Sequence, residues 1–258
     1  MAALRSQLDD LTMTVYSRFR LDQKTVLVTG ASSGIGRSIV QMCSDAGATV
    51  ILHGRNKERL VNIRSSLSNL DHAIFSGDLT NPSDISTLVD NCPLLDGVVH
   101  SAGIHGVAPM RLVQTKMLED VFQINYIAPM SLTQKLLFKK KVRQNGSILF
   151  ISSIAAKTGK VGVGPYSGSK AALLGSMRPL ALEVAKHGVR VNALCPGIVK
   201  TPLFQGQDEW LNDEVAASYP LGLGEPEDVA HAAVFFLADA SRMITGVDFS
   251  IDGGVPFT

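Results

Sequence analysis

The sequence predicts an α/β fold in which one doubly wound parallel sheet of seven strands carries helices on both faces. The first observation is that short runs rich in β-branched residues alternate with amphipathic segments of helix length, which is the pattern of repeated βαβ units. The second is that no linker-like change of composition divides the 258 residues, of which 45% are hydrophobic and 18% charged. A chain of this length can bury a sizeable core, so we expect a single domain.

Seven runs have the composition of buried strands, and a crossover of helix length leads to each of the later ones. Local sequence also marks two helix starts. Asn81 before Pro82 is typical of an N-cap followed by the first helical residue, and Pro226 with Glu227 and Asp228 opens another helix. The predicted strands are 25–29, 49–52, 73–75, 97–100, 147–151, 189–194 and 248–251.

Charge and cysteine usage exclude several classes of function. The net charge is +1 and the charged residues are interspersed, which argues against a nucleic-acid-binding surface. Cys43, Cys92 and Cys195 are far apart and form no CxxC pair, so we expect a reducing compartment and no metal site. Residues 1–20 lack the continuous apolar core of a signal peptide or a membrane span. We therefore predict a cytoplasmic protein without membrane or nucleic-acid partners, with 1–20 as an N-terminal extension of one domain, 21–258.

One segment, 203–219, interrupts the simple alternation. It follows the sixth predicted strand, contains the single tryptophan, Trp210, and mixes acidic with aromatic residues. Such a segment suits a lid over a pocket, and it equally suits an ordinary surface excursion. The sequence leaves both interpretations open.

A glycine-rich turn directly follows the first predicted strand, with the spacing Gly-x-x-x-Gly-x-Gly. Glycines let the backbone turn tightly and approach a pyrophosphate, and the N–H groups and dipole of a helix that begins there attract phosphate charge. Its place between a first strand and a first helix favours dinucleotide binding over a plain tight turn, and the lack of Gly-Lys-Ser/Thr argues against a nucleotide triphosphatase. The candidate phosphate-binding residues are Gly30, Ser32, Ser33, Gly34, Ile35 and Gly36.

Tyr166 and Lys170 are spaced i and i+4 and would share one face of a helix. A lysine charge beside a tyrosine favours the phenolate, so we expect the pKa of Tyr166 to lie below its usual value of about 10, towards the range of a general acid/base. Ser153 lies thirteen residues before Tyr166, after the strand-like run 147–151, so its hydroxyl could face the same helix. The pair alone would also fit a surface tyrosine beside a solvated lysine, but Ser153 and the glycine turn favour a catalytic site.

Together these motifs resemble the short-chain dehydrogenase/reductase superfamily over residues 21–254. They are Thr-Gly-x-x-x-Gly-Ile-Gly after the first strand, Ser153, and Tyr166-x-x-x-Lys170. Within the superfamily the chain looks most like the 3-oxoacyl-(acyl-carrier-protein) reductases and the sugar or polyol dehydrogenases. The resemblance implies a Rossmann fold, NAD(P)-dependent oxidoreductase activity on the CH–OH groups of small molecules, and a homo-oligomer, either a dimer or a tetramer.

The resemblance also implies a role for each of four residues. Tyr166 would be the acid/base, and Lys170 would lower its pKa and bind the nicotinamide ribose. Ser153 would hold the substrate oxygen by a hydrogen bond, and Asn125 would position a water that relays protons to Lys170. Two alternatives stay open: Asn125 could be a satisfied helix asparagine, and Ser152 rather than Ser153 could face the pocket.

The end of the second predicted strand decides the cofactor. A carboxylate there would bind the adenine ribose hydroxyls of NAD and repel a 2'-phosphate, whereas an arginine pairs with that phosphate. Gly54 stands where NAD-preferring relatives carry aspartate, Arg55 follows it, and Arg37 could add a second positive charge. We therefore expect NADP(H), with NAD(H) as the alternative. Asp78 resembles the family's adenine contact, although it could instead be a turn-forming aspartate.

The resemblance implies further cofactor contacts from three loops, among them a backbone contact from Ile198 and a side-chain contact from Thr201. These residues are Leu79, Ser101, Ala102, Gly103, Pro196, Gly197, Ile198 and Thr201, in addition to Tyr166 and Lys170.

Two histidines near the end of the fourth predicted strand have no fixed role in the family pattern. His100 stands where relatives usually carry asparagine, and we expect it to be a satisfied structural group. His105 could reach the substrate side.

The expected reaction is the NADPH-dependent reduction of a ketone, a 3-oxoacyl or related carbonyl compound, to a secondary alcohol with Tyr166 as the acid/base. The basic run 139–141 could meet an acidic carrier protein or complement a helix C-terminus. Gln144 and His187 occupy the positions of the family's carrier-docking arginines, which argues against a housekeeping fatty-acid role. One alternative is an NAD(P)-linked sugar or polyol dehydrogenase working oxidatively. Another is a non-catalytic NADP(H)-binding sensor, which would have no use for the four catalytic candidates together.

Overall fold

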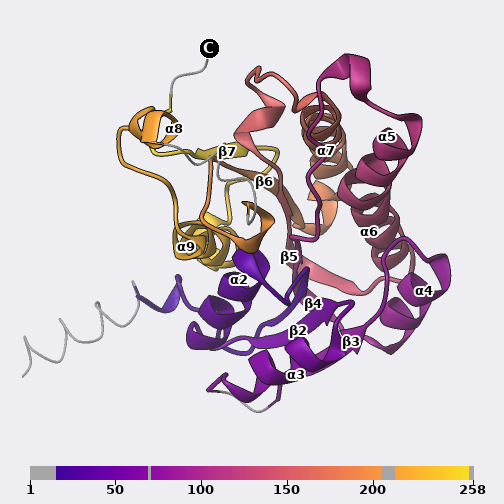
Figure 1. Cartoon of the computed structure of the whole chain (residues 1–258). Helices are drawn as coiled ribbons and strands as arrows, with labels where there is room; N and C mark the ends of the chain where they lie inside the picture. The colour runs from indigo at the N-terminus through magenta and orange to yellow at the C-terminus, as the bar shows by residue number, and fades with distance from the viewer. Residues whose placement is uncertain (1–15, 69–70, 205–212, 256–258) are drawn as a thin grey trace, which may run out of the picture.

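The computed structural model describes residues 16–68, 71–204 and 213–255. It contains the predicted seven-stranded parallel sheet, with strand order β3-β2-β1-β4-β5-β6-β7 (Figure 1). The strands are β1 (Thr25–Thr29), β2 (Thr49–Gly54), β3 (Ala73–Ser76), β4 (Leu95–His100), β5 (Val142–Ile151), β6 (Arg190–Pro196) and β7 (Asp248–Ile251).

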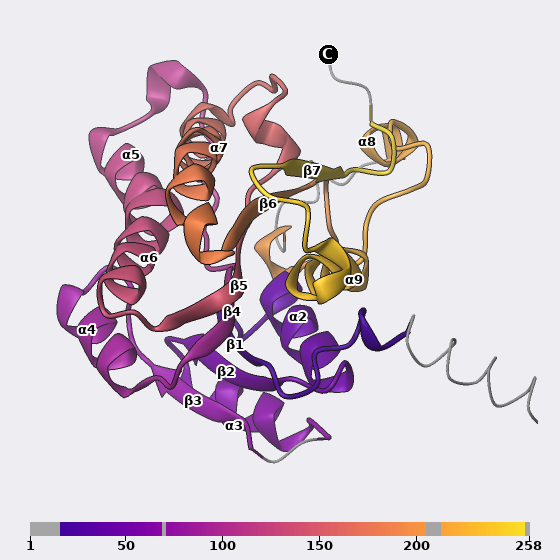
Figure 2. The ribbon, with the colours of Figure 1, turned by 180° about the vertical axis from the view of Figure 1, so that it is seen from behind.

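Helices cover both faces of the sheet and enclose two hydrophobic clusters (Figures 1 and 2). Ile39, Leu60 and Phe236 bring α2, α3 and α9 into one cluster, and Leu88, Leu132 and Met177 bring α4, α6 and α7 into the other. The helices are α2 (Gly34–Asp45), α3 (Lys57–Ser65), α4 (Pro82–Asn91), α5 (Thr115–Phe122), α6 (Ala128–Phe138), α7 (Gly164–Val184), α8 (Asp213–Ala217) and α9 (Pro226–Leu237). Short 3-10 or π turns are η1 (Met110–Leu112), η2 (Gln123–Ile127), η3 (Ile154–Ala156), η4 (Ala185–His187), η5 (Pro202–Phe204) and η7 (Asp239–Ser241).

Both helix starts predicted from capping chemistry are present. Asn81 caps α4 by accepting a hydrogen bond from the Ser83 N–H at 3.0 Å, and Pro82 follows it. α9 begins with Pro226 inside a capping box, in which the Glu225 N–H donates to the Asp228 carboxylate at 2.8 Å.

The largest boundary error concerns β5, which begins at Val142 rather than at 147. Its first residues pair with the start of β4, but the register shifts between Leu95 and Gly97, where Asn145 adopts a left-handed φ of 61°. Arg143, Gln144 and Asn145 in this irregular part are polar and exposed, so their composition gave no strand signal.

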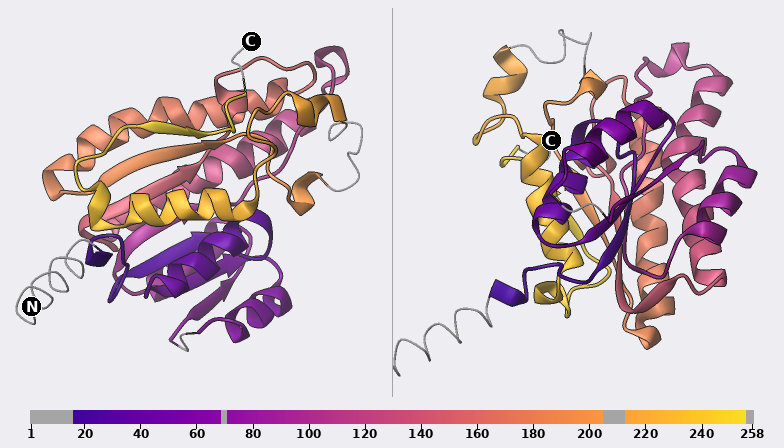
Figure 3. Two further views of the ribbon diagram at one scale, coloured as in Figure 1. Left: turned by 90° about the vertical axis from the view of Figure 1, so that its left-hand side faces the viewer. Right: turned by 90° about the horizontal axis from the view of Figure 1, so that it is seen from below.

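The last residues of the predicted N-terminal extension pack onto the domain. Phe19 stacks on Phe235 of α9 with ring centroids 6.3 Å apart, and the Ala240 N–H donates to the Arg18 carbonyl at 2.9 Å. Figure 3 shows this indigo segment at the opposite end of the molecule from α8. The packed part of the chain therefore begins several residues before 21.

The strand order creates the place for a site. After β3, at one edge of the sheet, the chain crosses back to add β4 on the other side of β1. At such a reversal the loops after β1 and β4 diverge, and the crevice beyond the carboxyl ends of the strands is where α/β sheets bind ligands. None of the described helices is both long and apolar enough to cross a membrane.

Candidate active site

The N-terminus of α2 opens into this crevice without the side-chain cap and the acidic residue in the first turn that α3 and α4 have. Its N-cap, Ser33, makes no side-chain capping hydrogen bond, and the first turn holds no acidic residue. By contrast, Asn56 caps α3 with Glu58 in its first turn, and Asn81 caps α4. The first N–H groups of α2 and the positive end of its dipole therefore face the cavity, which suits a pyrophosphate.

Two glycines of the turn are required by close backbone contacts. A Cβ on Gly36 would lie 2.2 Å from the Gly30 carbonyl oxygen. Gly30 has a φ of +67°, and a Cβ there would lie 2.8 Å from the backbone of Ala102. The two glycines thus allow β1, α2 and the loop after β4 to pack closely. At this part of the cavity wall, backbone atoms are exposed in place of side chains.

Thr29 joins the two loops that meet at the crevice. Its hydroxyl oxygen accepts hydrogen bonds from the N–H groups of Ser101, at 3.2 Å, and Ala102, at 3.3 Å. Ser101, Ala102 and Gly103 consequently lie along the cavity beside the glycine turn.

Arg55 and Asp78, the residues expected near the adenosine of the cofactor, both line the cavity. Asp78 Oδ1 accepts hydrogen bonds from the Thr80 N–H and hydroxyl, each at 2.8 Å, so this aspartate has the turn-forming role that the sequence left open. The Thr80 N–H is the largest cause of the lowered pKa of Asp78, and the Arg55 charge contributes to it. Leu79 also lies on the wall, whereas Arg37 is exposed and lies outside it.

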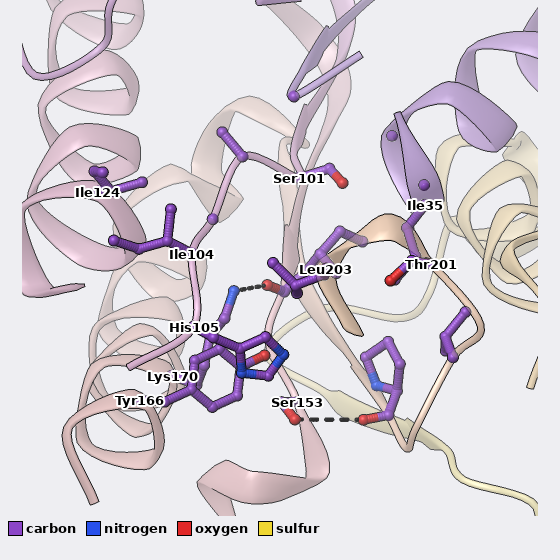
Figure 4. Close-up of a pocket in the computed structure, with 18 of the residues that line it drawn as sticks. Ile35, Ser101, Ile104, His105, Ile124, Ser153, Tyr166, Lys170, Thr201 and Leu203 are labelled. Atoms are coloured by element: carbon purple, nitrogen blue, oxygen red, sulfur yellow. Dashed lines mark hydrogen bonds between the residues drawn. The ribbon is translucent and has the colours of Figure 1, made fainter. Parts of the chain in front are cut away.

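Ser153, Tyr166 and Lys170 meet at the other end of the cavity (Figure 4). Ser153 follows β5, while Tyr166 and Lys170 lie one turn apart on α7, with the Lys170 Nζ 5.7 Å from the centre of the tyrosine ring. Lys170 is buried and donates from Nζ to the Ile151 carbonyl at 2.8 Å. Ser152 donates its hydroxyl to the Lys170 carbonyl at 3.0 Å and thereby anchors α7 to β5.

The ionisation of this group differs from the sequence expectation. Burial raises the pKa of Tyr166 to about 12, and the hydrogen bond with Ser153 opposes that rise. Burial also lowers the pKa of Lys170 to about 8. The expected lowering of the Tyr166 pKa is therefore wrong for this structure, because the loss of hydration outweighs the favourable contacts of the phenolate.

Asn125 lies in the π turn η2 and is almost fully buried, at 1% exposure. Its side chain accepts from the Ile104 N–H at 2.8 Å and donates to the Ile104 carbonyl at 2.9 Å and to Ser169 at 3.0 Å. The side chain is thus committed to holding the loop after β4 against α7. The residue four positions later, Pro129, has no N–H to donate to the Asn125 carbonyl.

The segment after β6 forms a further wall of the site. Thr201 packs against the glycine turn, where a Cβ on Gly34 would lie 3.2 Å from it. Ser153 donates weakly to the Pro196 carbonyl at 3.5 Å. The Ile198 N–H, expected to contact the cofactor, instead donates to the Tyr219 hydroxyl at 3.1 Å, so it is already engaged in this conformation.

The cavity has a volume of about 510 Å³, and it includes wall residues that the sequence did not single out. Around Ser153 and Tyr166 the walls are mainly apolar, and Asp78 is the one carboxylate among the described lining residues. Hydrophobic residues in loops gave no signal because loop positions have no fixed periodicity. The additional residues are Ile104, Val107, Ile154, Ala155, Thr158, Lys160 and Val163. His105, which the sequence placed on the substrate side, also lines the cavity, as do Leu203 and Tyr219 from the two ends of the segment 203–219.

The two histidines after β4 have different environments. His100 is buried, stacks on Phe150 at 4.9 Å and shares a hydrogen bond of 2.8 Å between its Nε2 and Thr133, as a structural residue would. Its buried Nδ1 has no hydrogen-bond partner among the described residues, so the expectation of a fully satisfied group is wrong. His105 lines the cavity beside Tyr166. Cys195 is buried with a raised pKa, which disfavours its thiolate. Within the described ranges, no cluster of His, Cys, Asp and Glu could hold a metal ion. Trp210 lies outside the described residues.

The Rossmann-type sheet, the open N-terminus of α2 and the serine, tyrosine and lysine at one cavity define an NAD(P)-dependent oxidoreductase that acts on CH–OH groups. The family described as enoyl-(acyl carrier protein) reductase, a short-chain dehydrogenase family, matches residues 30–256. The chain belongs to the short-chain dehydrogenase/reductase family.

Individual relatives are similar over nearly their whole lengths. The chain is 34% identical over 236 residues to a 3-oxoacyl-(acyl-carrier-protein) reductase, FabG, of Rickettsia felis, covering 91% of this chain and 98% of that protein. It is 33% identical over 257 residues to a (3R)-3-hydroxyacyl-CoA dehydrogenase of Mus musculus, covering 93% and 98%. A solved candidate NAD(P)-dependent gluconate 5-dehydrogenase of Beutenbergia cavernae, with NADP bound at low occupancy, shares 31% identity with a TM-score of 0.83, covering 92% and 98%.

Proposed function

We propose that the protein reduces a ketone, a 3-oxoacyl or related carbonyl compound, to a secondary alcohol with NADPH. The observation that carries this proposal is that Ser153, Tyr166 and Lys170 line one cavity with the open N-terminus of α2. A binding protein without catalysis would need the helix terminus and the adenosine contacts, but it would have no use for a buried lysine one turn from a tyrosine at the far end of the cavity.

Each side chain has a task in this reaction. Ser153 and Tyr166 hold the substrate oxygen by hydrogen bonds, and Tyr166 gives its proton to that oxygen as negative charge develops on it. When bound, NADPH would supply the hydride for the carbonyl carbon. With the pKa of Tyr166 raised by burial, the phenol is protonated at neutral pH, which is the form required of an acid in the reductive direction.

Lys170 and Asn125 support the tyrosine. An ammonium at Lys170 stabilises the phenolate left after proton transfer, and the same group would bind the nicotinamide ribose. The main-chain carbonyl of Asn125, which cannot receive an α-helical bond from Pro129, is the group we assign to a water that returns protons towards Lys170. Its side chain has the separate task of holding Ile104.

NADP(H) is the preferred cofactor in this proposal. Arg55 lines the cavity at the end of β2, and Gly54 places no carboxylate there that would repel a 2'-phosphate. The solved relative with bound NADP is in keeping with this preference. Arg37 does not line the cavity, which gives it a smaller part than Arg55.

The wall of the cavity favours an acyl substrate. Val107, Ile154, Val163 and Leu203 offer apolar surface near Tyr166, whereas a polyol would require several polar partners for its hydroxyl groups. The similarity to 3-oxoacyl and 3-hydroxyacyl enzymes points the same way. A sugar or polyol dehydrogenase is the second candidate, and the similarity to a candidate gluconate 5-dehydrogenase favours it.

We further propose a homo-oligomer, a dimer or a tetramer, in the cytoplasm. Exposed apolar side chains support it: Phe138 on α6 is 75% exposed, Leu182 on α7 is 79% exposed, and Phe249 lies on the edge strand β7. Light scattering after size exclusion would measure the assembly, and a monomer at micromolar concentration would contradict it.

The experiment that tests the function follows the absorbance of the reduced nicotinamide with NADPH and, in parallel, NADH. Acetoacetyl-CoA, diketones, cyclic ketones and keto sugars are the substrates, and Tyr166→Phe is the matched variant. We expect NADPH to support acetoacetyl-CoA reduction and Tyr166→Phe to lose most of the turnover while still binding NADPH. Turnover confined to sugars would favour the second candidate, and an active Tyr166→Phe enzyme would exclude Tyr166 as the acid.

A further inference from the structure

His105 covers one face of the Tyr166 ring. The two ring centroids are 4.7 Å apart and the planes meet at 29°, a stacked arrangement (Figure 4). Both residues line the cavity, and the histidine comes from the loop after β4, whereas the tyrosine comes from α7. The contact therefore joins two separate elements of the site at the reacting side chain itself.

The loop holds His105 in place from both sides. Immediately before it, the Ile104 N–H and carbonyl are bound by the buried amide of Asn125 at 2.8 and 2.9 Å. Immediately after it, Gly106 lies so close to α5 that a Cβ would be 2.5 Å from the Val121 side chain. Two residues further on, the Ala108 N–H donates to the Gly162 carbonyl at 2.8 Å, which ties this loop to the one preceding α7. Such anchoring fixes the backbone on both sides of His105, from which the imidazole stacks on the phenol.

We propose that His105 is a positioning residue for Tyr166, whose imidazole fixes the rotation of the phenol ring and keeps water from one of its faces. The inference rests on the proposed function, because it assumes that Tyr166 transfers the proton. A proton donor must be held within about an ångström of its productive position, since small misplacements cost large factors in rate. A tyrosine ring rotates about a broad, shallow torsion, so a stacked neighbour is an effective way to restrict it.

The charge of the imidazole is compatible with this role. Burial, aided by the Lys170 ammonium, lowers the pKa of His105 to about 4, so the ring is neutral at physiological pH and does not repel Lys170. The other groups that affect the ionisation of Tyr166 are the Ser153 hydroxyl and the Cys195 thiol. Lys160, which is exposed, also lines the cavity. None of these groups stacks on the phenol, so a substitution at His105 is the way to change the stacking contact.

Three substitutions distinguish the effect of the stacked ring from the effect of the polar atoms of His105. His105→Phe keeps a ring against Tyr166, His105→Asn keeps a polar group without a ring, and His105→Ala removes both. With acetoacetyl-CoA and NADPH, we expect the Asn and Ala variants to lose about tenfold or more in kcat, with little change in KM or in the Kd for NADPH. The Phe variant should keep kcat within about twofold of the wild-type enzyme.

The pH profile of the reverse reaction gives a readout that a merely structural role would not move. Oxidation of 3-hydroxybutyryl-CoA requires the phenolate, so its rate rises with pH through the apparent pKa of Tyr166. Removing the imidazole of His105 lets water reach the phenol and stabilise the phenolate, which lowers the pKa of Tyr166. The rising limb should therefore move to lower pH in the Ala and Asn variants and stay in place in the Phe variant.

Several outcomes would overturn the inference. An Asn variant as active as wild type, or a Phe variant as impaired as Ala, would assign His105 a polar role in place of stacking. If Tyr166→Phe is inactive while His105→Ala keeps the wild-type rate and profile, His105 has no positioning role but the proposed function stands. If Tyr166→Phe is fully active, or the wild-type protein does not reduce acetoacetyl-CoA, the proposed function fails and this inference with it. Thermal unfolding of each variant monitors folding, and the Phe and Asn variants decide the question if Ala fails to fold.

Discussion

The buried amide of Asn125 donates to the hydroxyl of Ser169 at 3.0 Å, and this hydroxyl in turn donates to the Tyr166 carbonyl at 2.7 Å. The chain of hydrogen bonds crosses from the π turn to the turn of α7 that carries Tyr166 and Lys170. Asn125 also holds both backbone groups of Ile104. One side chain thereby fixes the loop after β4 relative to the catalytic helix.

Asn125→Ala should therefore reduce both stability and kcat. It leaves the part-buried backbone groups of Ile104 without their partner and removes one of the two hydrogen bonds of the Ser169 hydroxyl, at about 1–3 kcal/mol for each buried group left unsatisfied. We expect urea denaturation to show a loss of several kcal/mol in the free energy of unfolding. Ser169→Ala removes only the last link and should cost less, about 1 kcal/mol. Equal losses in the two variants would contradict the role of Asn125 in holding Ile104.

Gly36→Ala should abolish tight NADPH binding. The new methyl group would lie 2.2 Å from the Gly30 carbonyl oxygen, so the glycine turn must open and its N–H groups must leave the phosphate position. We expect the Kd for NADPH, measured by fluorescence titration, to rise more than tenfold, with about 1–3 kcal/mol lost from stability.

Gly175→Ala on α7 is the matched control, because a Cβ there meets nothing within 4 Å. This substitution should leave NADPH binding unchanged and increase stability by about 0.4–1 kcal/mol. Equal effects of the two alanines on NADPH binding would exclude the close approach of Gly36 and Gly30 as the reason for the glycine.

Arg55→Ala should weaken NADPH binding far more than NADH binding. A hydrogen bond to a charged group contributes about 1.5–3 kcal/mol, which corresponds to roughly 10- to 150-fold in Kd. NADH lacks the 2'-phosphate, so its Kd should change less than about threefold. Arg59→Ala, an exposed arginine of α3, is the control for loss of a positive charge nearby. Equal losses for both cofactors in Arg55→Ala would exclude a 2'-phosphate contact.

Buried neutral histidines should make the protein sensitive to acid. Burial lowers the pKa of His100 to about 3 and that of His53 to about 4, against about 6.5 in the unfolded chain. Between those values the unfolded chain binds protons that the folded protein does not, so the free energy of unfolding falls as the pH falls below about 6.5. At pH 5 each histidine accounts for up to about 2 kcal/mol of this loss.

His100→Asn tests the contribution of His100 to the acid sensitivity, because asparagine keeps a hydrogen-bonding group but does not titrate. Denaturation between pH 7 and pH 4.5 should show a shallower loss of stability than in the wild-type protein. His187→Asn, at an exposed position, should leave the slope unchanged. A His100→Asn profile parallel to the wild-type profile would show that His100 takes up no proton on unfolding.

The parts of this site that the sequence predicts are those encoded by local chemistry. The seven strands, the glycine turn before α2 and the spacing of Tyr166 and Lys170 each follow from a pattern within a few residues. The raised pKa of Tyr166 and the stacking of His105 depend on burial and on contacts between distant segments. No periodicity or capping rule reports such contacts, which is also why the engaged N–H of Ile198 was not predicted.

The last prediction concerns the Ile198 N–H, which donates to the Tyr219 hydroxyl at 3.1 Å while the tyrosine ring lies against Gly197. If Ile198 binds the cofactor through its backbone, as the family resemblance implies, the cofactor must compete with Tyr219 for this donor. Tyr219→Phe removes the competitor and keeps the ring, so we expect the Kd for NADPH to fall about fivefold, which corresponds to the net value of one hydrogen bond of about 1 kcal/mol.

Tyr126→Phe removes a hydroxyl that pairs with Ser176 at 2.9 Å, outside the cavity wall, and should leave NADPH binding unchanged. A Tyr219→Phe protein that binds NADPH more weakly than wild type would mean that Tyr219 keeps its bond in the complex. In that case the bond aligns the segment after β6 for the cofactor, and the Ile198 N–H is not one of the cofactor's contacts.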